Sequence, residues 1–188
     1  MDHGEWFSDL YRAHYAAVLR YALRRTDQET AHDVVSETFL VAWRRREAVP
    51  AGQGQQAPWL FGVARLALAN AERSRNRAQR VTARLGQQQR TDRQVPDPAG
   101  AVAEQERLRQ ALGSLSKTDQ EALRLVGWEE LDLAGAALAV GCQKSVMAVR
   151  LHRARRRLER ALVAADSAEH QSSGALPAPI REVSQETR

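Results

Sequence analysis

The chain has little of several residue types, and each shortage excludes a class of protein. It contains one cysteine among 188 residues, so no disulfide can form within it, and a reducing compartment such as the cytoplasm is expected. No stretch approaches the roughly eighteen consecutive apolar residues of a membrane-spanning helix, so no membrane insertion is expected. The first residues, MDHGEWFSDL, lack a basic segment followed by an apolar run and predict no signal peptide.

Motifs for bond-making chemistry are also missing. The five histidines are scattered, and none shares a metal-ligand spacing with the single cysteine. There is no glycine-rich phosphate loop and no nucleophile motif. We therefore expect no catalytic site, no metal and no other cofactor, and the protein is not expected to be an enzyme.

Lysine is scarce as well, since 26 of the 28 basic residues are arginine and the formal net charge is +5. This balance favours an anionic partner, although GC-rich coding would equally explain the excess of arginine over lysine. The charges alternate in blocks: residues 27–37 and 97–132 are mainly acidic, whereas 65–93 and 144–160 are mainly basic. Alternating blocks predict separate surfaces for separate partners.

Apolar residues recur at helical spacing along most of the chain, and strand-like alternation is hardly present. A first amphipathic stripe places Phe7, Leu10, Tyr11, Val18 and Ala22 inward. Further helices are predicted at about 29–46, from Pro58 to about Arg77 or beyond, and at about 101–112, 117–127, 133–140 and 143–164. Pro58 suits the first turn of its helix. Trp43 and Trp59 are interpreted as core residues.

A polar stretch with two prolines, residues 86–103, cannot build a core and is interpreted as a flexible linker. The fold class expected is therefore all-α, with two small helical domains at residues 1–85 and 104–165. Residues 166–188 are rich in Ser, Glu, Gln and Pro, and a disordered tail is predicted there.

Residues 131–157, LDLAGAALAVGCQKSVMAVRLHRARRR, have the pattern of a helix-turn-helix. Gly141 supplies the positive φ that ends the first helix, and Cys142 is expected to point into the core. Gly135 inside that helix costs about 1 kcal/mol relative to alanine. The second helix has an apolar face and an outward basic face. Its outward side chains suit a major groove with arginines behind them for phosphates, but a solvated basic face fits the same spacing.

Three segments in order resemble the extracytoplasmic-function (group IV) sigma factors of bacterial RNA polymerase. HDVVSETFLVAWRR (32–45) resembles region 2.2, APWLFGVARLALAN (57–70) resembles regions 2.3 to 2.4, and residues 112–158 resemble region 4. The resemblance covers the chain to about Ala164. It implies a sigma subunit that binds core RNA polymerase and directs promoter-specific transcription initiation by reading −35 and −10 DNA. The partners implied are the β′ clamp helices and β flap of the polymerase, promoter DNA and an anti-sigma factor.

The resemblance also assigns roles to residues. Asp33, Ser36 and Glu37 would bind core polymerase. The loop 50–57 corresponds to the promoter-melting loop, where Gln55 and Gln56 would hold a flipped base, unless it is only a flexible connector. The positions implied for −10 DNA are Gln55, Gln56, Arg65, Asn70, Arg73, Arg75 and Arg77. Those implied for −35 DNA are Lys144, Ser145, Val146, Val149, Arg150, His152, Arg153 and Arg156.

Val146 and Ala148 cannot hydrogen-bond a base, so thymine methyl contacts or DNA shape are expected to carry more of the −35 specificity. Two alternatives remain at this point. One is a stand-alone helix-turn-helix regulator that binds duplex DNA, and the other is a helical adaptor that binds acidic proteins. The acidic second helix, the loop and the basic third helix favour the sigma subunit, because a simple regulator does not need them.

Overall fold

The computed structural model describes residues 2–84 and 101–173, and these residues form helices without any strand. The elements are α1 (His3–Leu23), α2 (Gln28–Arg44), the short 3₁₀ helix η1 (Arg46–Ala48), α3 (Gln53–Arg84), α4 (Ala101–Gly113), α5 (Lys117–Gly127), α6 (Leu133–Val140) and α7 (Lys144–Ser173). The all-α class with two helical domains is confirmed. No helix in the described ranges is long and apolar enough to cross a membrane.

Side-chain caps set the ends of several helices. Asp27, Ser116 and Asp132 each accept a hydrogen bond from a backbone N–H in the first turn of α2, α5 and α6. Gly141 has a φ of 76° and ends α6 in the left-handed conformation, as the sequence predicts. Met147 starts the buried stripe of α7, which continues through Leu151 and Ala154.

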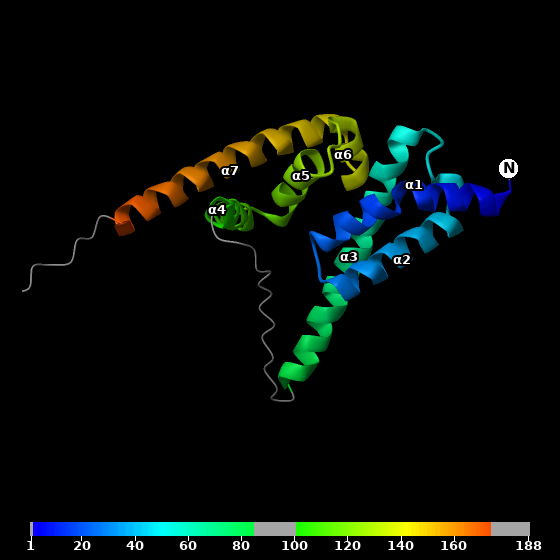
Figure 1. Cartoon of the computed structure of the whole chain (residues 1–188), viewed down its shortest axis with the longest axis horizontal. Coiled ribbons are helices and arrows are strands. Elements are labelled where there is room, and N and C mark those ends of the chain that lie inside the picture. The colour runs from blue at the N-terminus through cyan, green and yellow to red at the C-terminus, as the bar shows by residue number, and fades with distance from the viewer. Residues whose placement is uncertain (1, 85–100, 174–188) are drawn as a thin grey trace, which may run out of the picture.

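The helices form two lobes, and the lobes are packed against each other (Figure 1). In the first lobe, α1, α2 and α3 enclose Val18, Tyr21, Val34, Phe39 and Leu60. In the second lobe, α4, α5 and α6 pack beside or beneath α7. One buried cluster runs through both lobes, because α6 lies directly on α3.

The contact between α3 and α6 is close enough to favour glycine at two positions. A Cβ atom on Gly62 would lie 3.1 Å from the Ala139 carbonyl oxygen, and one on Gly135 would lie 3.1 Å from Pro58 Cγ. This approach explains why α6 tolerates the helix-weakening Gly135. Cys142 is half-buried against the same cluster, in agreement with its expected core position.

Several boundaries differ from the prediction. α3 begins at Gln53, so Pro58 lies inside the helix instead of in its first turn, and the second half of the loop 50–57 is helical. α4 begins at Ala101, inside the stretch 86–103 that was expected to be linker; residues 86–100 lie outside the described residues.

The predicted disordered tail is wrong for its first residues, because α7 continues to Ser173. Residues 166–173 contain good helix formers and neither proline nor glycine before Gly174, so nothing stops the helix earlier. Residues 174–188 lie outside the described part of the chain.

Two aromatic residues that were expected in the core lie at the surface. Trp43 is 40 % exposed and Tyr11 is 41 % exposed. Helical spacing predicts on which side of a helix a residue lies but not how deeply it is buried. These two rings lie at the edge of the α1–α2 contact, where each is only partly covered. Trp59, in contrast, packs against the core as expected.

Candidate polymerase and nucleic-acid interfaces

The acidic face of α2 lies open. Asp33, Ser36 and Glu37 are exposed and follow one another at helical spacing, so they share one side of the helix. The Ser36 hydroxyl donates a hydrogen bond of 2.9 Å to the His32 carbonyl, which fixes the side chain along its own helix. The structure therefore brings together all three positions assigned to polymerase binding.

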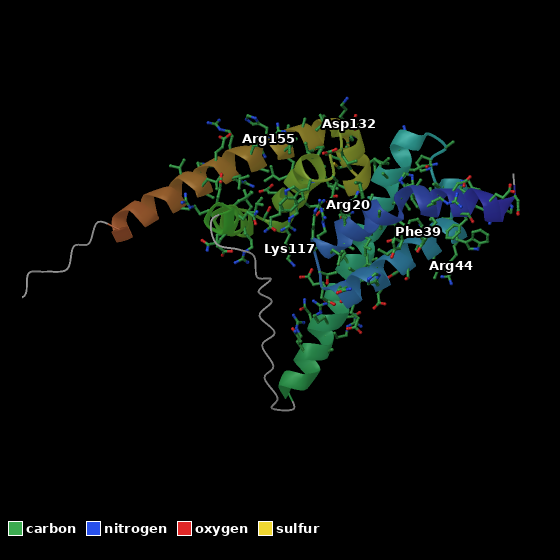
Figure 2. All side chains as sticks on the ribbon, viewed as in Figure 1. Arg20, Phe39, Arg44, Lys117, Asp132 and Arg155 are labelled. Carbon is green, nitrogen blue, oxygen red and sulfur yellow. The ribbon has the colours of Figure 1, made fainter. Side chains whose placement is uncertain are left out.

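An aromatic groove of about 410 Å³ adjoins this acidic face, between α1 and α2. Phe7 and Trp43 meet edge to face with ring centroids 5.2 Å apart, and Tyr11 and Phe39 lie 4.7 Å apart. Figure 2 shows Phe39 and Arg44 on this part of α2. Exposed aromatic surface of this kind is typical of protein contacts. Sequence reasoning missed it, because it interpreted Tyr11 and Trp43 as core.

The two glutamines assigned to base capture lie side by side at the start of α3, but their side chains have different surroundings. Gln55 is exposed. Gln56 is half-buried, and its Oε1 lies 3.1 Å from His14 Nε2 on α1. The two side chains are thus in different environments, one facing solvent and one tied to the first helix of the lobe.

The basic residues of α3 also divide into two groups. Arg65 donates to the carbonyl oxygens of Ala139 and Val140 at 3.4 and 3.3 Å, at the carboxyl end of α6. Arg75 donates to Asp27 Oδ2 and Thr30 Oγ1, both at 3.0 Å, at the start of α2. These two guanidinium groups are engaged within the protein.

Asn70, Arg73 and Arg77 are exposed on a different side of α3. At 100° per residue they fall within about 60° of one another, on the side that Gln55 shares. Asn70 accepts a hydrogen bond from Arg73. In Figure 1 the second half of α3 projects beyond α1 and α2. This outward polar and basic face has the composition of a nucleic-acid contact.

The outward face of α7 carries most of the positions assigned to −35 DNA. Ser145, His152, Arg153 and Arg156 are exposed, and Val146 and Val149 are 45 % and 51 % exposed. Lys144 is exposed at the first residue of α7, and Arg150 is half-buried at the edge of the face. A shallow groove of about 470 Å³ runs between this face and Asp119.

Asp119 anchors α7 and was not identified from the sequence. Its side chain is 7 % exposed and binds Arg157 of α7. Its backbone N–H donates a hydrogen bond to the side-chain oxygen of Ser116, the N-cap of α5, so Asp119 lies in the first turn of that helix. Its position three residues after the Ser116 cap is the one signal in the sequence, and no local pattern identifies Arg157 as its partner.

A buried ionic cluster joins the two lobes. Arg25 of α1 binds Glu121 and Glu129 of the second lobe, each at 3.0 Å, with the Arg25 side chain 7 % exposed. The Tyr21 hydroxyl donates to Glu121 at 2.7 Å. Burial, and then the charge of Glu121, raises the pKa of the Tyr21 phenol. Arg24 adds a bond of 2.9 Å to Glu129.

The same cluster affects the neighbouring arginines. Burial would lower the pKa of Arg25, but Tyr21 and the carboxylates outweigh burial and raise it, so this guanidinium stays charged. Burial, and then the charge of Arg25, lowers the pKa of Arg124. Sequence reasoning missed the cluster: the acidic block 97–132 was expected to face a separate partner, whereas part of it faces this chain.

Nothing in the described residues gathers three or more His, Cys, Asp or Glu side chains that could hold a metal ion. The site consists of charged, polar and aromatic surfaces.

Comparisons with known proteins point to one family. Residues 10–78 match the model of Sigma-70 region 2, and residues 105–158 match that of Sigma-70, region 4. The chain is 32 % identical over 150 residues to the ECF RNA polymerase sigma factor SigL of Mycobacterium tuberculosis, covering 79 % of this chain and 84 % of SigL. It is 31 % identical over 163 residues to the RNA polymerase sigma factor YlaC of Bacillus subtilis, covering 85 % and 94 % of the two chains.

Solved structures agree. The sigma factor RpoE of Bartonella quintana, in complex with the anti-sigma factor NepR, matches with a TM-score of 0.63 and 25 % identity over 83 % of this chain and 96 % of that one. CnrH, in complex with the cytosolic domain of CnrY, has the same fold, with a TM-score of 0.58 and 22 % identity over 84 % and 88 % of the two chains.

Proposed function

The chain belongs to the extracytoplasmic-function sigma factors of bacterial RNA polymerase. We propose that three separate exposed surfaces bind the polymerase, the −10 element and the −35 element. It is a sigma subunit that binds core RNA polymerase and directs promoter-specific transcription initiation. A stand-alone regulator is not favoured, because the match to Sigma-70 region 2 covers the first lobe. The proposal concerns which residues perform each step.

The first surface docks on the polymerase. Asp33 and Glu37 give α2 a negative face, and the groove beside them offers Tyr11 and Trp43 for apolar contact. Such a combination suits a partner with basic and apolar side chains, and we assign it to the β′ clamp helices. The second lobe is assigned to the β flap.

The second surface reads and opens the −10 element. Asn70, Arg73 and Arg77 form the exposed face of α3, and Gln55 extends it toward the start of the helix. Gln55 can turn to a flipped base, whereas Gln56 serves to hold α3 against His14. Arg65 and Arg75 have structural partners and contribute less to DNA contact in this arrangement.

The third surface reads the −35 element from the major groove. Val146 and Val149 at the start of α7 supply apolar contacts with thymine methyl groups. Arg153 and Arg156 follow one and two turns later and suit the phosphates. The working units are the two lobes, the first built from α1 to α3 and the second from α4 to α7. The protein itself breaks no bond, and it acts in the cytoplasm beside the polymerase.

An anti-sigma factor is proposed as a further partner. The RpoE relative was solved with one, and it matches both lobes of this chain. Binding of this chain to a co-expressed anti-sigma protein would test that part separately.

The observation that carries the proposal is the presence of two outward basic helix faces, on α3 and α7, in different lobes. Reconstituted holoenzyme is tested with two probes, a −10 fork junction and a −35 duplex. Arg73→Ala should weaken binding of the fork junction, and Arg153→Ala should weaken binding of the duplex. Arg20→Ala, an exposed arginine on α1, is the matched control. Equal effects of Arg73→Ala and Arg153→Ala on both probes would contradict the division of labour.

A further inference from the structure

A cavity of about 420 Å³ lies between the two lobes, and we call it the interlobe cavity. Residues of α1, α3 and α5 line it, together with Val140 at the end of α6. Its volume falls within the roughly 300–1,000 Å³ of small-molecule sites. Five basic and two acidic side chains line it, so positive charges exceed negative ones by three. This excess of positive charge suits an anion.

Three of the five basic side chains have carboxylate partners within the protein. The pairs are Arg25 with Glu121 and Glu129, Arg75 with Asp27, and Lys117 with Glu72. Lys117 and Glu72 are exposed, and Figure 2 shows Lys117 at the edge of the second lobe that faces α3. The other two basic residues, Arg65 and Arg124, form no ion pair with any residue in the described ranges.

Arg124 of α5 is half-buried, and its Nε is buried without a hydrogen-bond partner among the described residues. Its guanidinium carbon lies 5.6 Å from the centre of the Trp128 ring. Burial, and then the charge of Arg25, lowers the pKa of Arg124. Burying a charged donor without an acceptor costs free energy. An anion in the cavity would supply the acceptor and offset the charge of Arg25.

Arg65 brings a second guanidinium to the cavity from the other lobe, because it lies on α3. Its Nε and Nη2 donate to the Ala139 and Val140 carbonyls at 3.4 and 3.3 Å, which is longer than the usual 2.7–3.2 Å of such bonds. No hydrogen bond between described residues uses Arg65 Nη1. The planar fork of arginine matches the oxygens of a phosphate group. Arg65 and Arg124 together therefore favour phosphate as the anion.

The rest of the lining is partly apolar, since Leu68, Ala69 and Ala71 of α3 face the same space. Small-molecule sites typically combine apolar walls with a few polar groups that fix orientation. A ligand with a phosphate end and a flat, less polar end fits this division. A cavity of about 420 Å³ does not admit a DNA duplex, whose major groove alone is about 12 Å wide.

We propose that the interlobe cavity binds a small phosphorylated ligand of the nucleoside diphosphate class. Arg65 and Arg124 hold its phosphates, and Leu68 and Ala69 pack against its base. The inference goes beyond the proposed function, because it does not depend on which surfaces contact polymerase and promoter DNA.

Isothermal titration calorimetry of the full chain tests the ligand class with three probes. ADP carries both a diphosphate and a base, inorganic pyrophosphate carries only the phosphates, and adenosine carries only the nucleoside. We expect saturable binding of one ADP per chain, with pyrophosphate bound more weakly and adenosine at least ten-fold more weakly than ADP. If neither ADP nor pyrophosphate binds at millimolar concentration, the inference is wrong.

Variants locate the binding. Arg65→Gln and Arg124→Gln should each weaken ADP binding at least ten-fold, whereas Arg20→Gln, an exposed arginine of α1 outside the lining, should leave it unchanged. Equal affinity in Arg124→Gln and Arg20→Gln would place the binding on the basic surface at large and overturn the inference. Circular dichroism verifies that the helices are retained.

A cavity-filling variant tests the same site without removing a charge. Ala69→Phe enlarges a side chain of the apolar wall, so it should also weaken ADP binding at least ten-fold. A single-stranded oligonucleotide, titrated in parallel, covers the other source of phosphate groups. If Arg124→Gln weakens the oligonucleotide but Ala69→Phe leaves ADP binding unchanged, the arginines contact nucleic acid and the cavity is not a ligand site.

Discussion

Removing Arg25 should destabilise the protein far more than removing a surface arginine. The Arg25 side chain is 7 % exposed, and its partners Glu121 and Glu129 are 16 % and 4 % exposed. Arg25→Ala would leave two buried carboxylates with only Tyr21 and Arg24 to compensate them. Losing one partner of a buried ion pair typically costs about 3–5 kcal/mol. For a chain of this length, the melting temperature should then fall by roughly 6–20 °C.

The assay is urea and thermal unfolding followed by far-UV circular dichroism. Arg12→Ala is the control, because Arg12 and Asp9 form a pair whose side chains are 78 % and 75 % exposed, and such pairs contribute about 1 kcal/mol or less. A loss of stability for Arg25→Ala no larger than that for Arg12→Ala would show that the buried ion pairs of Arg25 do not stabilise the protein. If uncompensated charge is the cause, adding Glu121→Gln and Glu129→Gln should recover part of the loss.

Three further predictions concern the functional surfaces. Glu37→Arg should weaken core polymerase binding at least several-fold with unchanged helicity, because it reverses an exposed charge on the docking face; equal affinity in a fluorescence titration would contradict this. Arg153→Ala and Arg156→Ala should each lower the salt slope of −35 binding by about one, uniformly across sequences, since phosphate contacts carry no base information; a change of base preference at one position would indicate direct readout. Gln55→Ala should impair −10 melting in permanganate footprinting, and a premelted template should rescue it, whereas Gln56→Ala should mainly lower the melting temperature; thymine reactivity unchanged in Gln55→Ala would leave the loop a connector.

The helices of the second lobe are largely predictable from sequence. α5 and α6 have the bounds that the sequence predicts, since Ser116, Asp132 and Gly141 are local signals that mark helix ends. The exposed faces of α2 and α7 follow from helical spacing. The start of α3 could not be predicted in this way, because the preference of proline for the first turn of a helix puts the start near Pro58. A proline at the sixth position removes the hydrogen bond to the Gly54 carbonyl and crowds that carbonyl, but only five helical residues precede it, and the helix continues through it.

The contact between the lobes could not be predicted from local pattern. Tyr21 and Glu121 are 100 positions apart, and Arg65 and Val140 are 75 apart. No periodicity or cap relates residues at such separations, so basic and acidic blocks look like surfaces for other molecules. For the same reason the sequence did not predict that Arg65 and Arg75 form hydrogen bonds within the protein. Their partners lie on α6 and at the start of α2.

This chain is expected to give RNA polymerase its choice of promoter. Run-off transcription with purified core polymerase, on a template that carries a −35/−10 pair selected by the reconstituted holoenzyme, measures it most directly. We expect one discrete transcript that requires the chain and disappears when either element is replaced. Transcription that starts equally without the chain, or persists when both elements are scrambled, would contradict it.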